Sequence, residues 1–318
     1  MSHEVETMAY AGETPWHGLG VRVSNDLTPE QMMKAAGLDW EVKKKPLFIN
    51  TQSKYVKVPA KQALVRVRPG QPDEYLDMVG AGWNPVQNAE GFAFFDEFVK
   101  EGQMEMHTAG SLRTGRVVWA LAKIKDSFEA VKGDVIDGFM LFTIPHIYGR
   151  PTDVRFTPIR VVCNNTLTMA LAKNAKAKNS VTVNHRQPFN ADRVKELLGI
   201  AHSHLNDYKE AATFLASVKA DKDSLSDYFN QVFPRTSDST GKKEPSRQHD
   251  RAMGIIDKQP GHEFAPGTWW QALNAVTYIC DHEIGSDATR LDNAWYGHNR
   301  NRKLKAMSLA VEMANAAR

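Results

Sequence analysis

The residues with the clearest chemical potential in this sequence are the basic side chains between residues 150 and 186. Seven cations lie there with a single acid, Asp153, so the stretch carries a local excess of six positive charges. Guanidinium and ammonium groups repeated along a strand and the segment after it match the repeated charges of a phosphate backbone. The alternative is a solvated basic face that acids elsewhere in the fold neutralise. The predicted nucleic-acid contacts here are Arg155, Arg160, Lys173, Lys176, Lys178 and Arg186.

Further basic side chains lie on strands predicted nearby. If one sheet gathers them on one side they extend the same contact, and each neutralised phosphate releases about 0.7 to 0.9 counterions. Tyr55, Trp83 and Tyr148 are suited to stack on unpaired bases, a contact worth about 1 to 3 kcal/mol per base, although most aromatic side chains belong to a core. The added contacts are Arg113, Arg116, Lys123 and Lys125, and the lysines of earlier strands are Lys43, Lys44, Lys45, Lys54 and Lys57.

Residue types suited to catalysis occur without the partners that catalysis needs. Cys163 stands where a strand meets a helix N-terminus, which lowers a thiol pKa, but the sequence places no histidine as its base. Asp281 and His282 have no partner at a recognised metal-ligand spacing. Motifs for phosphate loops, dinucleotides, serine hydrolysis and zinc proteolysis are absent. We predict no catalytic residue, cofactor or metal site. An enzyme acting on nucleic acid through Cys163, His146 or Asp281–His282 stays an open alternative.

A sheet must position the basic residues. The first half of the chain has β-branched and aromatic runs bounded by Gly, Pro or Asn, which is typical of strands. Residues 117–124 are apolar on both faces, which indicates a central strand. Pro158 predicts a bulge in the strand that carries Arg155. The predicted strands are 40–50, 54–68, 74–79, 104–111, 116–125, 135–144 and 154–163.

Helices are predicted within the first half and throughout the second. Asn88 is suited to cap a helix over 89–101, and Thr28 to cap one over 29–36. Asn190 caps a long helix that continues through Leu215. The remaining helices are predicted around residues 225–232, 269–279 and 304–311.

The composition describes a globular chain of α+β class. Its 318 residues exceed the usual size of one core, so we predict an α+β sheet domain over 1–187, mostly antiparallel with packed helices, and a helical domain over 188–318. The polar segment 234–250 is predicted to be a mobile loop. Two cysteines form no disulfide framework, and no signal or membrane-spanning pattern appears, so we expect a cytoplasmic protein with no membrane contact.

Several strings resemble one family. They are ETPWHGLG near the N-terminus, AGLDWEV, WNPVQN before a Phe-rich helix, FTPIRVVCNNTL and GTWWQALNAVTYICDH. Together they resemble the phage/plasmid-like proteins of domain of unknown function 932, over most of the chain. Residues 144–149 depart from the Ser-His-Asp-Gly turn expected in that family, and only His146 and Gly149 match it. The resemblance implies a mobile genetic element, which favours DNA handling.

The leading hypothesis is a non-enzymatic, homo-oligomeric protein that binds single-stranded DNA, with an annealing role in recombination or replication. This role rests on fold-level analogy to the annealing proteins of phages. The alternative is a protein-interaction factor that targets a host or defence component.

Overall fold

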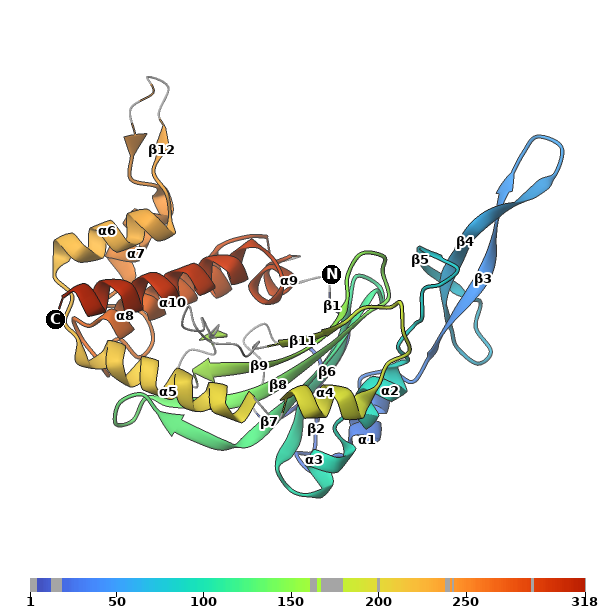
Figure 1. The fold of residues 1–318 in the computed structure, drawn as a ribbon, viewed down its shortest axis with the longest axis horizontal. Coiled ribbons are helices and arrows are strands. Elements are labelled where there is room, and N and C mark those ends of the chain that lie inside the picture. The colour runs from blue at the N-terminus through green and yellow to red at the C-terminus, as the bar shows by residue number, and fades with distance from the viewer. Residues whose placement is uncertain are drawn as a thin grey trace. The chain divides into compact units, whose positions relative to one another are not determined.

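In this computed structural model, residues 5–12, 19–160, 165–166, 180–198, 201–237, 241, 243–286 and 289–317 are described (Figure 1). The strands are β1 (Val5–Ala11), β2 (Val21–Val23), β3 (Glu41–Asn50), β4 (Tyr55–Val67), β5 (Glu74–Gly80), β6 (Met104–Leu112), β7 (Val117–Glu129), β8 (Val135–Pro145), β9 (Thr152–Arg160), β10 (Asn165–Thr166), β11 (Ser180–Val183), β12 (Thr236–Ser237) and β13 (Lys243–Glu244). The helices are α1 (Pro29–Ala35), α2 (Asn88–Ala93), α3 (Asp96–Lys100), α4 (Ala191–Leu198), α5 (Ala201–Ser217), α6 (Lys222–Val232), α7 (Arg247–Ile255), α8 (Trp269–Tyr278), the π-helix η2 (Ile279–Glu283), α9 (Arg290–Trp295) and α10 (His298–Ala316).

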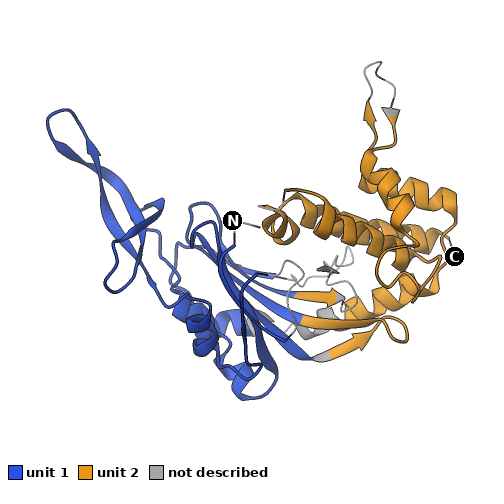
Figure 2. Cartoon of the chain, turned by 180° about the vertical axis from the view of Figure 1, so that it is seen from behind, with its two compact units in different colours: residues 1–125, 139–156, 180–199 blue, residues 126–138, 157–179, 200–318 orange. Residues whose placement is uncertain are grey.

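The chain forms two compact units that alternate along the sequence (Figure 2). Unit 1 contains residues 1–125, 139–156 and 180–199, and unit 2 contains residues 126–138, 157–179 and 200–318. Residues 188–199, predicted to open the helical domain, belong to unit 1. The division at residue 187 stays a prediction.

The strands form a mixed, mostly antiparallel architecture that confirms the α+β prediction. The described strands of the large sheet follow the order β10-β9-β8-β7-β6-β1-β2, and β11 also pairs with β9. β1 and β2 are parallel, whereas β1–β6, β6–β7, β9–β10 and β9–β11 are antiparallel. Residues 117–122 of β7 are buried on both faces, so the prediction of a central strand is confirmed. Helices α1 and α3 pack on β6.

β3, β4 and β5 form a separate three-stranded sheet. Short turns join these strands, so each finds its neighbour locally; Thr51 and Lys54 close the β3–β4 turn through a backbone hydrogen bond of 2.9 Å. The condition that one sheet gathers the lysines of β3 and β4 with the cations of β6, β7 and β9 is therefore not met. Strand periodicity predicts that strands exist, and it does not specify which strands pair.

Two helix predictions need correction, and one is confirmed. Thr28 caps α1 with a full capping box: its hydroxyl accepts from the Gln31 N–H at 3.2 Å. The helix predicted over 89–101 is interrupted between α2 and α3 at Phe94 and Phe95, which are 1% and 0% exposed. The interruption lets both rings reach the core. The N-cap of α2 is Gln87 and not Asn88 as predicted. The Asn88 side-chain amide instead donates to the Leu38 carbonyl at 2.8 Å.

Unit 2 has a helical core. α10 packs on α5, α6, α8 and α9, and Tyr228 donates to the Ala306 carbonyl at 3.1 Å. The segment predicted as a loop over 234–250 instead contains the β12–β13 pair, and α7 begins at Arg247. Ser246 caps α7 by accepting from the His249 N–H at 3.2 Å. The sequence did not predict α7, because most of its residues are polar and only one narrow face, which includes Ala252, is buried.

A buried guanidinium connects the two sheets of unit 1. Arg66 on β4 is 3% exposed and donates to both carboxylate oxygens of Glu6 on β1 at 2.9 Å. Glu6 also accepts from Ser111 of β6 at 2.8 Å, and Glu74 of β5 forms a second ion pair with Arg66. Burial alone would raise the pKa of Glu6, but the hydrogen bonds from Arg66 and Ser111 hold it below its ordinary value. Gly115 passes so close that an added Cβ would lie 2.6 Å from an Arg66 nitrogen.

We expect Arg66→Met to lower the free energy of unfolding by about 3 kcal/mol, because it leaves Glu6 partly buried without its cation. Arg68→Met is the matched control. Arg68 pairs with Glu74 at 2.9 Å, and both side chains are more exposed than Arg66, so its loss should cost less than about 1 kcal/mol. Urea unfolding measures both, and equal effects would contradict the role of Arg66.

Candidate functional site

Three loop segments of unit 1 enclose a hollow of about 570 Å³. They follow β5 (residues 80–83), join β8 to β9 (148–151) and follow β11 (184–186). These segments are far apart in the sequence, so the hollow exists only in the folded chain. We call this site the hollow.

Specific hydrogen bonds hold the three segments together. The Asn84 N–H donates to the His185 carbonyl at 2.7 Å, and His185 Nδ1 donates to the Asn84 carbonyl at 2.8 Å. The carboxylate of Asp77, on β5, accepts from the Tyr148 backbone N–H at 2.7 Å. One backbone hydrogen bond and two bonds made by the His185 and Asp77 side chains therefore hold the walls of the hollow in place.

Aromatic rings line the hollow. The Trp83 indole stacks on the His185 imidazole with a centroid separation of 4.0 Å and an interplanar angle of 18°. Both are buried, whereas Tyr148 is 68% exposed. Lys61 Nζ, from β4, lies 5.8 Å from the centre of the Tyr148 ring. A planar ligand placed here would meet a large aromatic face beside a cation.

The lining is cationic. Arg150 and Arg186 both line the hollow, and none of its described lining residues is acidic. Burial lowers the pKa of His185, although its hydrogen bonds to the carbonyls of Asn84 and Arg150 oppose this shift. The positive charge comes from the two lining arginines and from Lys61 beside them, and the Asp77 carboxylate lies next to the lining at the Tyr148 N–H.

Glycines keep the hollow open. Gly80 and Gly82 line it, and an added Cβ at either position would meet nothing within 4 Å. Gly149 has a φ of +83°, a conformation that a side chain would strain.

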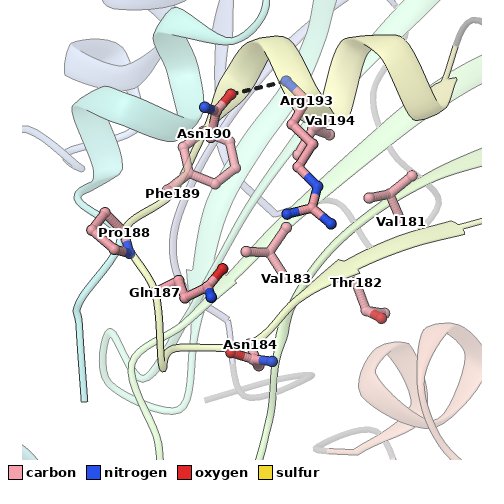
Figure 3. Close-up of a pocket in the computed structure, with 10 residues that line it drawn as sticks. All are labelled: Val181, Thr182, Val183, Asn184, Gln187, Pro188, Phe189, Asn190, Arg193 and Val194. Atoms are coloured by element: carbon pink, nitrogen blue, oxygen red, sulfur yellow. Dashed lines mark hydrogen bonds between the residues drawn. The ribbon is translucent and has the colours of Figure 1, made fainter. Parts of the chain in front are cut away.

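A second cavity of about 490 Å³ adjoins the hollow and shares Asn184 with it (Figure 3). Val181 and Val183 of β11 form one wall, and Arg193 extends from α4 toward them. The Asn190 side chain accepts from the Arg193 backbone N–H at 2.9 Å, which confirms Asn190 as the cap of α4. The two cavities thus continue along the segment between β11 and α4.

The structure gathers only part of the predicted basic set. Arg186 lines the hollow. Arg155 is 14% exposed and paired with Asp153, because residues two apart on a strand share a face; the expected open basic strand is wrong at this residue. Arg160 is the last residue of β9, and its side chain lies outside the described part of the structure. Lys173, Lys176 and Lys178, with Cys163, lie outside the described residues.

The remaining predicted cations lie apart from one another. Arg113 and Arg116 occupy the β6–β7 turn, whereas Lys123 and Lys125 lie toward the other end of that hairpin, about 24 to 31 Å away at about 3.4 Å per residue. Sequence reasoning missed Lys61, whose place above Tyr148 depends on the fold. Trp83 and Tyr148 were among the predicted stacking residues, and the structure brings them to one hollow.

The residues weighed as enzymatic candidates have structural contacts where they are described. His146 is fully buried, and its Nε2 donates to Asn88 Oδ1 at 3.0 Å. Asp281 pairs with the buried Lys303 at 2.5 Å. The neighbouring Cys280 was not among these candidates; burial raises the pKa of its thiol to about 12, so it stays protonated. Within the described part of the chain, no group of three His, Cys, Asp or Glu side chains is placed to hold a metal ion, and no helix is long and apolar enough to cross a bilayer.

Fold and site together define an α+β protein with a cationic, aromatic hollow. The sequence profile of the domain of unknown function (DUF932) matches residues 75–307, which is more than two thirds of the chain. The chain belongs to this family, as its sequence strings predicted. The match includes every lining segment of the hollow and begins after β3 and β4. No curated protein and no solved structure matches the chain.

We expect stability to fall as the pH drops below about 6.5. Burial, with the charges of His185 and Arg66, lowers the pKa of His146 to about 3. The unfolded chain therefore binds a proton that the folded chain excludes between about pH 6.5 and 3, and stability falls by up to about 1.4 kcal/mol per pH unit for this group. The contribution of His146 to the free energy of unfolding is therefore complete above about pH 6.5 and lost below about pH 3.

His146→Gln keeps an N–H donor for Asn88 and removes the titration. Urea unfolding across this pH range should show a shallower slope for the variant. An identical slope in both chains would contradict the prediction.

Proposed function

We propose that this protein binds single-stranded nucleic acid at the hollow. The observation that carries the proposal is an exposed Tyr148 and a Trp83–His185 stack beside Arg150, Arg186 and Lys61, three cations against the single neighbouring carboxylate of Asp77 that is described here. The two arginines and Lys61 contact phosphates, and Tyr148 stacks on a base.

The choice of an unpaired strand follows from the aromatic contact. A base can stack on Tyr148 only when its own face is free, which a duplex does not permit. The hollow, at about 570 Å³, falls within the usual range of small-ligand sites and accommodates a nucleoside-sized group. Arg193 in the adjoining cavity extends the cationic path past Asn184.

The wider proposal is a role in annealing, recombination or replication on a mobile element, in the cytoplasm and as a homo-oligomer. Arg150 and Arg186 both belong to the basic stretch of the sequence and to the lining of the hollow. Light scattering of the pure protein tests the oligomer, and a monomeric mass would remove that part.

We expect a labelled single-stranded oligonucleotide to bind with an affinity that falls steeply as salt increases. Arg186→Gln should weaken binding and make the slope of log K against log salt shallower by about 0.7, because one phosphate contact is lost. Arg22→Gln removes the same charge from exposed β2 and serves as the control. Fluorescence anisotropy measures both. No binding at low salt, or equal effects of the two variants, would contradict the proposal.

Gly82 allows the hollow to be filled without straining the backbone. Gly82→Leu should weaken single-strand binding about tenfold and leave the melting temperature almost unchanged, because nothing lies within 4 Å of the new Cβ. Gly254→Leu is the matched control, since Gly254 in α7 is equally open and does not line the hollow. Unchanged binding by Gly82→Leu would show that the strand does not enter the hollow.

A further inference from the structure

The outer part of the β3–β4 hairpin projects beyond the rest of its sheet (Figure 1). β5 pairs only with residues 61–66 of β4, so beyond the Pro46–Gln62 pair the two described strands of the hairpin have no strand neighbours except each other. We call residues 46–60 the arm. Within it Phe48 pairs with Lys57, and Asn50 pairs with Tyr55.

The arm exposes large apolar side chains. Phe48 is 52% exposed, Ile49 54% and Tyr55 74%, and no residue of the arm is buried. Directly opposed residues of an antiparallel pair share a face, as do residues two apart, so Phe48, Lys57 and Tyr55 lie on one face. A two-stranded ribbon has no core of its own, so aromatic side chains exposed on it indicate a partner.

The positive charge of the β3–β4 hairpin indicates which kind of partner the arm would bind. Residues 42–72 contain six lysines and two arginines, and no Asp or Glu. Near the base Lys43 and Lys45 pair with Glu41 and Asp73. On the arm, Lys54 and Lys57 meet no carboxylate in the described chain, and a polyanion would complement them.

We infer that the arm is a second nucleic-acid-binding surface, which enters the major groove of a duplex. A two-stranded ribbon fits that groove, which is about 12 Å wide. Lys54 and Lys57 contact the phosphates of its walls, while Phe48 and Tyr55 contact the base edges, where an apolar side chain meets the thymine methyl group.

A second copy of this chain fits the arm less well. Pairing two arms along their free edges would place basic strands side by side, and like charges in opposed positions disfavour such a pair. Duplex binding by the arm also goes beyond the proposed function, because the hollow binds a single strand whereas the arm binds double-stranded nucleic acid.

β4 connects the two surfaces within unit 1. Lys57 lies on the arm, and Lys61, four residues along the same strand, lies over Tyr148 of the hollow. A nucleic acid whose duplex ends in a single strand would occupy both. Occupation of both surfaces at once rests on the proposed function, whereas the arm's contact with a duplex does not.

The test uses the full chain with a labelled blunt duplex and a labelled single-stranded oligonucleotide, each followed by fluorescence anisotropy over a range of salt. The charge variant is Lys54→Gln/Lys57→Gln, and the aromatic variant is Phe48→Ala/Tyr55→Ala. Lys222→Gln/Lys258→Gln removes the same charge from exposed positions of unit 2 and is the control. None of the arm positions is buried, so folding should be unaffected, which melting temperatures check.

We expect the charge variant to lose about tenfold in duplex affinity and to make the salt slope shallower by about 1.8, at about 0.9 counterions per phosphate. The aromatic variant should lose similar affinity with an unchanged slope. Single-strand affinity should stay within about twofold for both.

Duplex binding equal to that of the original chain in either variant would overturn the inference, as would no duplex binding at low salt. A loss confined to single-strand binding would assign the arm to the unpaired strand, and a fall in solution mass would assign it to a second copy; both overturn it. Gly82→Leu separates the two proposals. If it leaves single-strand binding intact while the arm variants lose duplex binding, only the proposal about the hollow fails.

Discussion

The arrangement of unit 1 depends on one buried positive charge. Arg66 is almost inaccessible to solvent, and a guanidinium so placed is tolerated only when carboxylates compensate its lost hydration. Glu6 comes from one sheet and Glu74 from the other, so neutralising this charge requires both sheets to be in place. The same guanidinium lies 5.2 Å from the Trp40 ring.

From Trp40 a continuous set of contacts leads toward the hollow. The Trp40 ring packs edge-on against the His146 ring, with a centroid separation of 5.3 Å. His146 donates a hydrogen bond to Asn88, and the Asn88 amide donates one to the Leu38 carbonyl. Burial, with smaller contributions from His185 and Arg66, lowers the pKa of His146 and keeps it neutral, which removes the need for a buried counterion. Two residues beyond His146, the chain emerges at the exposed Tyr148. Buried contacts between Arg66, Trp40 and His146 thus lie close in the chain to the exposed Tyr148 at the hollow.

Particular residues show how far the sequence predicted the fold and the site. The apolar run in β7 predicted a central strand, and Thr28 and Asn190 predicted helix starts, because these signals act within a few residues. The break at Phe94 and Phe95 was missed, since it depends on the core that those rings reach. Arg155 was predicted to be exposed, but it is half-buried and paired with the buried Asp153, two residues before it. Trp83, Tyr148 and Arg186 were identified by type, and nothing in their spacing indicated that they meet.

By itself the sequence determined the family, the α+β class, most element positions and the concentration of cations and aromatic side chains. These are properties of residue type and short-range periodicity. Only the tertiary structure decided that β3, β4 and β5 form their own sheet, that Lys61 reaches Tyr148, and that three distant loops enclose one hollow. Strand partners and buried ion pairs depend on contacts between residues tens of positions apart, and their free energy is set by packing and desolvation that no local pattern of residues encodes.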